Sequence, residues 1–412
     1  MVILNMKLEL KTFVFCLILI TIQGCEEDES SSIKLEAEKL SDTQMLLNWN
    51  TIKGSGSFNI WRMMRDNEQT SGLKLIASVD SLTTRYVDES FPQTNMLIYF
   101  VTSSVGNEEK KSNEVTVEGA SALYFTPYQM KLIPEKDLAV IRGYNEIILL
   151  DYSQKAILMR KEFPSKIGVI DFGKFNSSDE LYVPCSDNKV YICNPLDLTV
   201  KEVINVNYPA YAVAINSFGD IFVSVGSSSS TLKRFKRNSL SLVNEYDGTV
   251  SGIYLQSDNR LLAVSSHLMS FYNFSDNGLL ISKVNYPYSH DLESDRTRLS
   301  SHFVVSSSLG RVYTADDNMN QITMLNSESY LSDFEFSEDG KTIFSAITNV
   351  PSVKKSTISG TQVTWSLIRT KGYPWILARD NNELIILSSP ISFTPYHTIG
   401  QVIVEKVSTG ME

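Results

Sequence analysis

The sequence has few of the residues that build metal centres. Its 412 residues include only four cysteines and four histidines. The histidines stand far apart and lack the spacing of zinc ligands, at His267, His290, His302 and His397. Because the ligand residues do not cluster, we expect neither a metal nor a cofactor.

Motifs of common enzymes are also absent. The sequence contains no Gly-x-Ser-x-Gly elbow, no His-Glu-x-x-His pair and no phosphate-binding loop. The turn at residues 337–340 lacks the additional residue that the Asp-box of sialidases has between Asp and Gly. We therefore predict no catalytic residues and no enzymatic activity.

Clusters of basic residues are missing too. The chain carries a formal charge of −10 at pH 7. An acidic surface repels phosphate backbones, so nucleic acid is not an expected partner. Hydrophobic residues make up 42% of the chain and charged residues 20%, as in soluble globular proteins. The length of 412 residues suggests two domains.

Residues 1–24 have the pattern of a secretory signal peptide. Two lysines, Lys7 and Lys11, precede an apolar run at 13–22 that is too short for a transmembrane helix. Residues 22–25, Ile-Gln-Gly-Cys, resemble the lipobox of bacterial lipoproteins, although glutamine is not favoured before the glycine. The resemblance implies cleavage before Cys25, acylation of that cysteine and anchoring in a lipid membrane. The alternative is an ordinary signal peptide followed by an incidental cysteine.

An acidic tether is expected at residues 25–32, where Glu-Glu-Asp-Glu follows Cys25. It resembles the surface-export signal of lipoproteins in the Bacteroidota, which implies display on the outside of the outer membrane. The composition also fits an ordinary solvated linker. We therefore predict a lipid-anchored, surface-exposed protein of the outer membrane.

Residues 33–119 are predicted to form seven short strands. Apolar and polar residues alternate at 45–49 and 58–61, as in half-buried strands. The placement of Trp49, Tyr86 and Tyr99 resembles that of a fibronectin type III domain. The resemblance implies a β-sandwich with Trp49 between two sheets and Tyr99 in the tyrosine corner. Such a domain would be a rigid spacer or, alternatively, a docking surface for a partner protein.

A polar turn followed by a short apolar strand recurs through residues 120–412. The second strand of each repeat is expected near Leu138, Leu181, Ile221, Leu261, Val312, Ile343 and Leu384. Short strands with a period of about 41 residues are typical of a β-propeller. The turn at 337–341 resembles those of YVTN and WD40-like propellers, although the Gly-His and Trp-Asp signatures of true WD40 repeats are missing. We predict an all-β protein in which a fibronectin type III-like sandwich precedes a seven-bladed propeller.

Two local features of the propeller can be predicted. The interval before Val312 is long and the next one is short, so we expect a short fifth blade after an insertion. Since a ring must close to protect its edges, residues 122–125 should supply the outer strand of the last blade. In the hairpin around 186–189, Cys185 should face Val190 or Tyr191 rather than Cys193, so no disulfide is expected.

Candidate ligand-binding residues lie in the connections between blades, where an aromatic residue often precedes proline. Such a residue would present a flat ring at the mouth of the central channel. In the other interpretation, each aromatic residue packs between adjacent blades. The long connection at 284–300 is a candidate binding lid. The predicted ligand-binding set is Tyr208, Tyr211, Tyr286, Tyr288, His290, Arg296, Tyr373 and Trp375, with Phe163 as a further aromatic–proline pair.

Together these features predict an envelope protein whose propeller captures an extracellular ligand. It resembles propeller lipoproteins that capture vitamins, siderophores or glycans for a TonB-dependent transporter, so a small molecule or glycan and an outer-membrane transporter are the expected partners. Because fold and location do not determine function, two alternatives stay open. One is an assembly lipoprotein that binds other envelope proteins. The other is a polysaccharide-cleaving enzyme that uses His290, Asp291 and Glu293.

Overall fold

The structure, a computed structural model, describes residues 32–410 with short gaps. The gaps are 42–43, 67–68, 90–95, 119–122, 227–230, 249–250, 266–267, 288–295, 307–308, 326–329, 361, 391 and 394–398. The predicted signal peptide, Cys25 and nearly all of the acidic tether therefore lie outside the described residues. No helix within the described ranges is long and apolar enough to cross a membrane.

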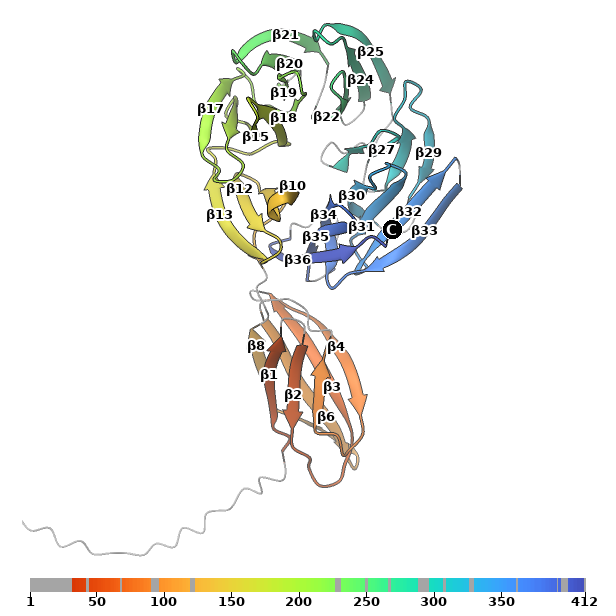
Figure 1. Ribbon diagram of the computed structural model, residues 1–412. Helices are drawn as coiled ribbons and strands as arrows, with labels where there is room; N and C mark the ends of the chain where they lie inside the picture. The colour runs from red at the N-terminus through yellow and green to blue at the C-terminus, as the bar shows by residue number, and fades with distance from the viewer. Residues whose placement is uncertain are drawn as a thin grey trace, which may run out of the picture.

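The strands before residue 119 form two antiparallel sheets (Figure 1). One sheet has the order β1 (Leu35–Ser41), β2 (Gln44–Trp49), β5 (Arg85–Asp88). The other has the order β4 (Gln69–Val79), β3 (Ser55–Asp66), β6 (Met96–Val105), β7 (Glu108–Lys111), with β8 (Val115–Glu118) also paired to β6. The described residues thus form eight strands rather than the seven predicted, because the last segment is divided into β7 and β8.

Side chains from both sheets meet in one apolar core, so this part of the chain is a β-sandwich. Trp49 is buried, and its ring centroid lies 5.8 Å from that of Phe58. Tyr99 is also buried, but its hydroxyl donates to the carboxylate of Asp88 at 2.8 Å. The tyrosine corner of such sandwiches instead uses a backbone acceptor. The predicted role of Tyr99 was therefore wrong in its bonding partner, because a buried carboxylate lies within reach.

Seven four-stranded sheets follow, and Figure 1 shows them arranged in a ring. The first blade contains β10 (Gln129–Ile133), β11 (Leu138–Arg142), β12 (Glu146–Asp151) and β13 (Ala156–Glu162), and the second contains β14 (Asp171–Phe175), β15 (Ser178–Cys185), β16 (Lys189–Cys193) and β17 (Val200–Asn205). The third blade contains β18 (Ala210–Ile215), β19 (Asp220–Val225), β20 (Thr231–Lys236) and β21 (Ser241–Asp247). The fourth contains β22 (Gly252–Ser257), β23 (Arg260–Val264), β24 (Leu268–Phe274) and β25 (Leu280–Pro287). A short 3-10 helix, η2 (Pro134–Lys136), joins β10 to β11.

The last three blades have the same composition. They contain β26 (Arg298–Leu299), β27 (Phe303–Ser306), β28 (Arg311–Thr314), β29 (Gln321–Met324); β30 (Leu331–Phe336), β31 (Thr342–Ile347), β32 (Ser352–Ser359), β33 (Gln362–Arg369); and β34 (Tyr373–Asp380), β35 (Glu383–Ser389), β36 (Gln401–Ser408), β9 (Leu123–Tyr124). The first strand of each blade lies nearest the centre of the ring. The seven blades confirm the predicted propeller.

The ring closes as the sequence predicts. Leu123 and Tyr124 of β9 pair with Val402 and Gln401 of β36, so a strand from before the first blade completes the seventh. A single core cluster then joins the two blades, with Phe125 and Met130 packing among residues of β34 and β35. The closing strand therefore contributes both backbone pairing and apolar contacts.

The second strand of the fifth blade does not begin where the predicted spacing placed it. Val312 lies in β28, the third strand, whereas the second strand is β27 and begins at Phe303. Gly310, with a φ of 65°, lies in the turn between the two strands. A turn of this pattern was expected before the second strand of the blade, but it precedes the third. With Phe303 in place of Val312 the repeat is regular. The fifth blade is short only in its strands, and its first strand comes from the end of the predicted lid.

The two remaining cysteines are free and buried. Cys185 lies opposite Lys189, and Cys193 lies opposite Leu181. The predicted neighbour of Cys185 was therefore wrong, because the turn spans residues 186–188 and ends one residue earlier than expected. Both thiols are used for packing between the first and second blades.

Candidate functional site

Two of the predicted aromatic residues pack between parts of the ring. Trp375 donates from its indole N–H to the carbonyl of Pro127 at 2.8 Å, and its ring meets that of Phe393 edge-on at 4.8 Å. Phe163 is buried, with its ring 5.3 Å from that of Tyr191. The ring of Trp375 joins the seventh blade to the segment before the first blade. The ring of Phe163 joins the first blade to the second. For them the structure favours the packing interpretation.

Three other predicted residues lie at or just before the first strand of a blade. Tyr208 lies between β17 and β18 and is 50% exposed, with the ammonium of Lys233 5.4 Å from its ring centroid. Tyr211 belongs to β18, where its carbonyl accepts a hydrogen bond from Val169 at 2.8 Å. Tyr373 begins β34 and is partly exposed.

The predicted lid contributes less than expected to a site. Tyr286 lies in β25, the outermost strand of its blade, rather than in a connection, and it packs against the core. Burial raises the pKa of its hydroxyl. Arg296 precedes β26 and is partly exposed. Tyr288, His290, Asp291 and Glu293 lie outside the described residues.

A cavity of about 290 Å³ lies at the centre of the ring, and we call it the channel. Every blade contributes to it through its first strand, from β10 to β34. Its apolar lining includes Met130, Val213, Ile215, Ile253, Leu255, Leu299 and Leu377, and its polar lining consists of Gln129, Lys131, Asp171, Tyr254, Arg298 and Glu335. None of the predicted ligand-binding residues that the structure describes lines this cavity.

Most of the polar groups in the channel bind groups of a neighbouring blade. The ammonium of Lys131 lies 2.7 Å from the carboxylate of Asp171, which joins the first two blades. The side-chain amide of Gln129 donates to the carbonyl of Ile170 at 3.0 Å and accepts from its N–H at 2.9 Å. These contacts hold the first strands in place around the channel.

A similar contact joins the last three blades. The guanidinium of Arg298 lies 2.6 Å from the carboxylate of Asp333 in β30, which is buried. The other oxygen of Asp333 accepts a hydrogen bond from the backbone N–H of Leu377 at 2.9 Å. Burial raises the pKa of Asp333, while the nearby Arg298 opposes the shift.

Glu335 differs from the other charged residues of the channel. Its side chain is partly exposed toward the cavity. Within the described part of the chain, its carboxylate accepts a hydrogen bond from the backbone N–H of Phe336 at 2.8 Å and forms no ion pair. Burial within the ring raises the pKa of this carboxyl group. Within the described residues, Glu335 is thus a carboxylate of the channel that is not held in an ion pair.

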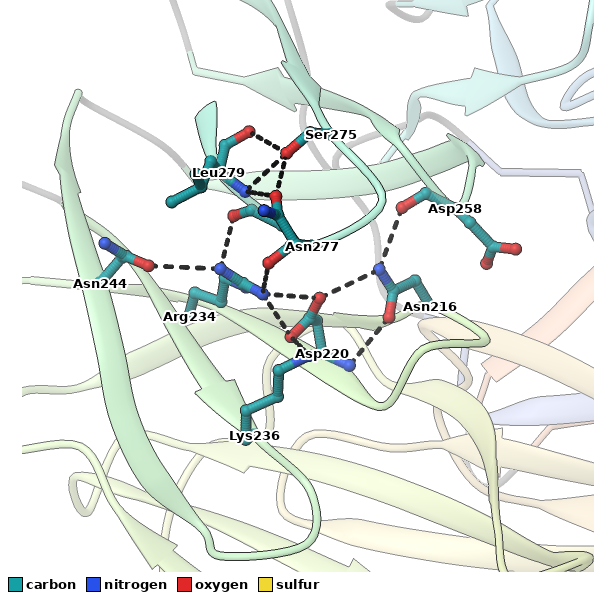
Figure 2. A network of polar contacts seen from close by, with 10 residues as sticks. Asn216, Asp220, Arg234, Lys236, Asn244, Asp258, Ser275, Asn277 and Leu279 are labelled. Carbon is teal, nitrogen blue, oxygen red and sulfur yellow. Dashed lines mark hydrogen bonds and ion pairs between the residues drawn. The ribbon is translucent and has the colours of Figure 1, made fainter. Parts of the chain in front are cut away.

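A second group of charges lies between the third and fourth blades (Figure 2), and we call it the seam cluster. Asp220 pairs with Arg234 at 2.9 Å and with Lys236 at 2.7 Å. Arg234 also donates to the carbonyls of Asn277 and Gly278 in the next blade. Because two cations neutralise the buried carboxylate of Asp220 and Arg234 also bonds to the next blade, this cluster holds the blades together.

A groove of about 590 Å³ lies between the first two blades, beside η2. Apolar side chains such as Phe172 and Leu196 line it together with Lys136, Lys174 and Lys201. The groove is larger than the channel, but lysines and carboxylates such as Asp179 both line it, and Lys174 lies 3.6 Å from Asp179. It therefore shows no single charge preference.

The described residues contain no group of three or more His, Cys, Asp or Glu side chains that could hold a metal ion. Asp316 accepts hydrogen bonds from its own loop, from Thr314 and from the N–H groups of Asn318 and Met319. Asp317 pairs with Arg260 at 2.8 Å. These contacts explain the conformation of the loop without a cation.

The charges of the channel were missed because they lie within strands. Lys131, Asp171 and Glu335 each occupy the first strand of a blade, whereas the site residues were predicted in connections between blades. Arg298 falls within the predicted lid at 284–300 but belongs to β26. A charged residue within an apolar first strand was the available signal. This signal can be used only when the segment that forms the innermost strand of each repeat is known.

No known protein-family model matches the sequence, and no curated protein does. Solved structures do resemble the fold. The β-propeller domain of Myceliophteria thermophila Cps50 (Swd1) is similar with a TM-score of 0.50 and 10% identity, over 69% of this chain and 97% of that one. Chaetomium thermophilum Raptor is similar with a TM-score of 0.50 and 14% identity, over 69% of this chain but only 28% of Raptor.

A chain in the structure of the Mitotic Checkpoint Complex is also similar, with a TM-score of 0.50 and 9% identity. The match covers 68% of this chain and 90% of that one. At these identities the likeness concerns the fold alone. The chain therefore contains a WD40-like β-propeller.

Proposed function

We propose that this protein is a lipid-anchored binding protein of the outer membrane, whose propeller captures an extracellular ligand in its channel. The observation that carries the proposal is the channel itself. Seven first strands enclose a cavity of about 290 Å³ on which polar and apolar side chains converge. A concave site with several convergent polar groups is the usual place for a small-molecule ligand.

The proposed location is supported by the sequence of the N-terminus. The signal pattern at 1–24, Cys25 and the acidic residues 26–29 together fit an acylated and exported lipoprotein. The sandwich supports a division into a spacer at 33–119 and a propeller at 120–412. Each sheet in the described residues uses strands either up to β8 or from β9 onward. We propose that the spacer is a fibronectin type III-like domain.

The anchor can be tested with a labelled fatty acid in growing cells. We expect label on the wild-type protein and none on the Cys25→Ala variant, with only the wild type in the membrane fraction. Protease treatment of intact cells should then degrade the wild-type protein. Label on Cys25→Ala, or survival of the wild type until the cells are lysed, would contradict the proposed anchor or display.

Capture can be tested by purifying the tagged, lipidated protein from membranes. We expect an outer-membrane transporter together with a small molecule or glycan. The Cys25→Ala variant serves as the control for association that does not need the membrane. Recovery of only structural envelope proteins, with no small molecule or glycan, would contradict capture.

One observation favours the assembly alternative. Large apolar side chains are exposed on outermost strands, with Ile281 of β25 69% exposed and Trp365 of β33 62% exposed. Such residues at the rim are suited to contact another protein. If assembly is the function, Trp365→Ser should abolish copurification with envelope proteins, whereas changes in the channel should leave it intact.

A further inference from the structure

We propose that the channel binds a small organic cation, such as an alkylammonium ion, through the carboxylate of Glu335. The inference rests on the proposed function in placing the captured ligand in the channel. It goes further by naming the chemical class of that ligand. It follows from the charge balance of the cavity, from its lining and from its size.

The first step is the charge balance around the channel. Lys131 is matched by Asp171 at 2.7 Å, and Arg298 is matched by Asp333 at 2.6 Å. The carboxylate of Glu335 remains after these pairs are formed, and its hydrogen bond comes from an uncharged backbone N–H. The two cations and two carboxylates that line the channel sum to zero, but Arg298 pairs with Asp333 outside the lining, so within the described residues Glu335 is the carboxylate left without an ion pair. An anionic ligand would meet no unmatched cation there.

The second step is the cost of that charge. A carboxylate within a protein interior is destabilised unless a counter-charge or several donors compensate for the lost water. The charges that act on Glu335 come from Arg298 on β26, Asp333 on β30 and Arg379 on β34. Arg298 is already bound to Asp333, so it only partly compensates Glu335. A cationic ligand would supply the missing charge.

The proton equilibrium of Glu335 supports this step. Burial raises the pKa of the carboxyl group, so the free protein favours the protonated form more than an exposed glutamate does. A bound ammonium group favours the ionised form. Binding should therefore release protons from the protein.

The third step is the lining of the channel. Val213, Ile253 and Leu255 provide apolar surface on the third and fourth blades, and Tyr254 adds an aromatic ring. An alkyl chain can pack against such residues while its charged end pairs with Glu335. The volume of about 290 Å³ lies at the lower end for ligand pockets, which favours a ligand of few heavy atoms.

A bare metal ion fits this site less well. Calcium takes several oxygen ligands, and magnesium also prefers more than one. The other carboxylates near the channel, Asp171 and Asp333, are already paired with a lysine and an arginine. A single carboxylate outside these pairs is too few oxygen ligands for such an ion, which favours an organic cation.

The test is calorimetric titration of the full-length lipidated chain in detergent. The probes are n-butylamine, which is cationic at neutral pH, and the uncharged n-butanol and anionic butyrate of similar size. The variant is Glu335→Gln, which removes the charge and keeps the shape. The control is Glu338→Gln, since Glu338 lies on the adjoining turn with a side chain that is 90% exposed.

We expect the wild type to bind n-butylamine at least about ten-fold more tightly than either other probe, as a charge-assisted contact should. Glu335→Gln should lose this preference, and Glu338→Gln should keep it. Equal binding of the amine and the alcohol, or an unchanged preference in Glu335→Gln, would overturn the proposal.

A second measurement uses only the wild type. Titration with n-butylamine in buffers of different ionisation enthalpy should show proton release, and its absence would overturn the link to Glu335. The result is also separable from the proposed function. A protein that copurifies with a transporter and a neutral or anionic ligand retains the capture function but refutes the cation. If the protein binds n-butylamine but is not anchored in the membrane, the proposed lipoprotein anchor is refuted and the proposed cation site in the channel is retained.

Discussion

The seam cluster and the channel contain the same kinds of charged residue in different balance. In the seam cluster, the buried Asp220 lies between the cations of Arg234 and Lys236 (Figure 2). In the channel, Glu335 accepts a hydrogen bond from the backbone N–H of Phe336 and forms no ion pair with a described residue. The comparison teaches that burial alone does not identify a functional charge. A matched charge joins blades, whereas an unmatched one destabilises the empty protein and is available to a ligand.

The largest effect should come from breaking a matched group. Arg234→Met leaves Asp220 with one cation and removes donors to the carbonyls of Asn277 and Gly278. Loss of one partner of a buried ion pair costs about 3–5 kcal/mol. Urea-induced unfolding should show a loss of this size. A loss no greater than that of an exposed charge would contradict the role of the seam cluster.

The sandwich extends the comparison to a third buried carboxylate. Asp88 pairs with Arg62 at 2.6 Å and accepts from the Tyr99 hydroxyl at 2.8 Å. Tyr99→Phe removes one hydrogen bond to a charged group and keeps the ion pair, so it should cost about 1.5–3 kcal/mol. Thermal unfolding of the full chain checks this value. An unchanged melting temperature would mean that Arg62 alone satisfies Asp88.

Glu335→Gln should have the opposite sign. Removing the unmatched charge should raise the free energy of unfolding by about 1 kcal/mol at neutral pH. The pKa of Glu335 is raised above its ordinary value of 4.5, so the folded protein holds its proton at a pH where the unfolded chain has lost it. The wild type is therefore least stable relative to the variant at high pH.

The gain in the free energy of unfolding caused by Glu335→Gln should depend on pH. Below the ordinary pKa, both states of the wild type carry a neutral carboxyl group, and the gain in Glu335→Gln should disappear. The gain should grow as the pH rises from the ordinary pKa toward the raised pKa of the folded state, and it should level off above that pKa. Chemical unfolding at several pH values measures it. A gain that grows as the pH falls would mean that Glu335 is matched in the native protein.

The smallest effect should come from an exposed pair. Lys174 lies 3.6 Å from Asp179, with side chains that are 78% and 61% exposed. Lys174→Ala should change the free energy of unfolding by no more than about 0.5 kcal/mol, because water and salt screen such pairs. Urea-induced unfolding beside Arg234→Met provides the contrast. Equal losses of unfolding free energy in Lys174→Ala and Arg234→Met would contradict the claim that a buried ion pair contributes more to stability than an exposed one.

Much of the fold could be predicted from the sequence, because it depends on periodicity. The repeat of turn and strand predicts seven blades, and the need for a closed ring predicts the pairing of Leu123 and Tyr124 with β36. Val312 was misplaced because a local turn pattern cannot tell the first hairpin turn of a short blade from the second. The sandwich was predicted by alternation around Trp49, but the bond from Tyr99 to Asp88 depends on contacts across strands.

The candidate site could not be predicted in the same way. Whether an aromatic–proline pair faces a channel or packs between blades depends on strand register, and Trp375 and Phe163 pack. The balance among Lys131, Asp171 and Glu335 depends on residues from different blades that meet only at the centre of the ring. A sequence shows each charge, but not which of them is left without a partner.

The central claim is that the channel captures a ligand through Glu335. The most direct test follows the melting temperature of the full-length chain as n-butylamine is added, because a ligand that binds only the folded state stabilises it. We predict a rise for the wild type and for Glu338→Gln, no rise for Glu335→Gln, and no rise with n-butanol. The same rise in Glu335→Gln, or none in the wild type, would contradict the account.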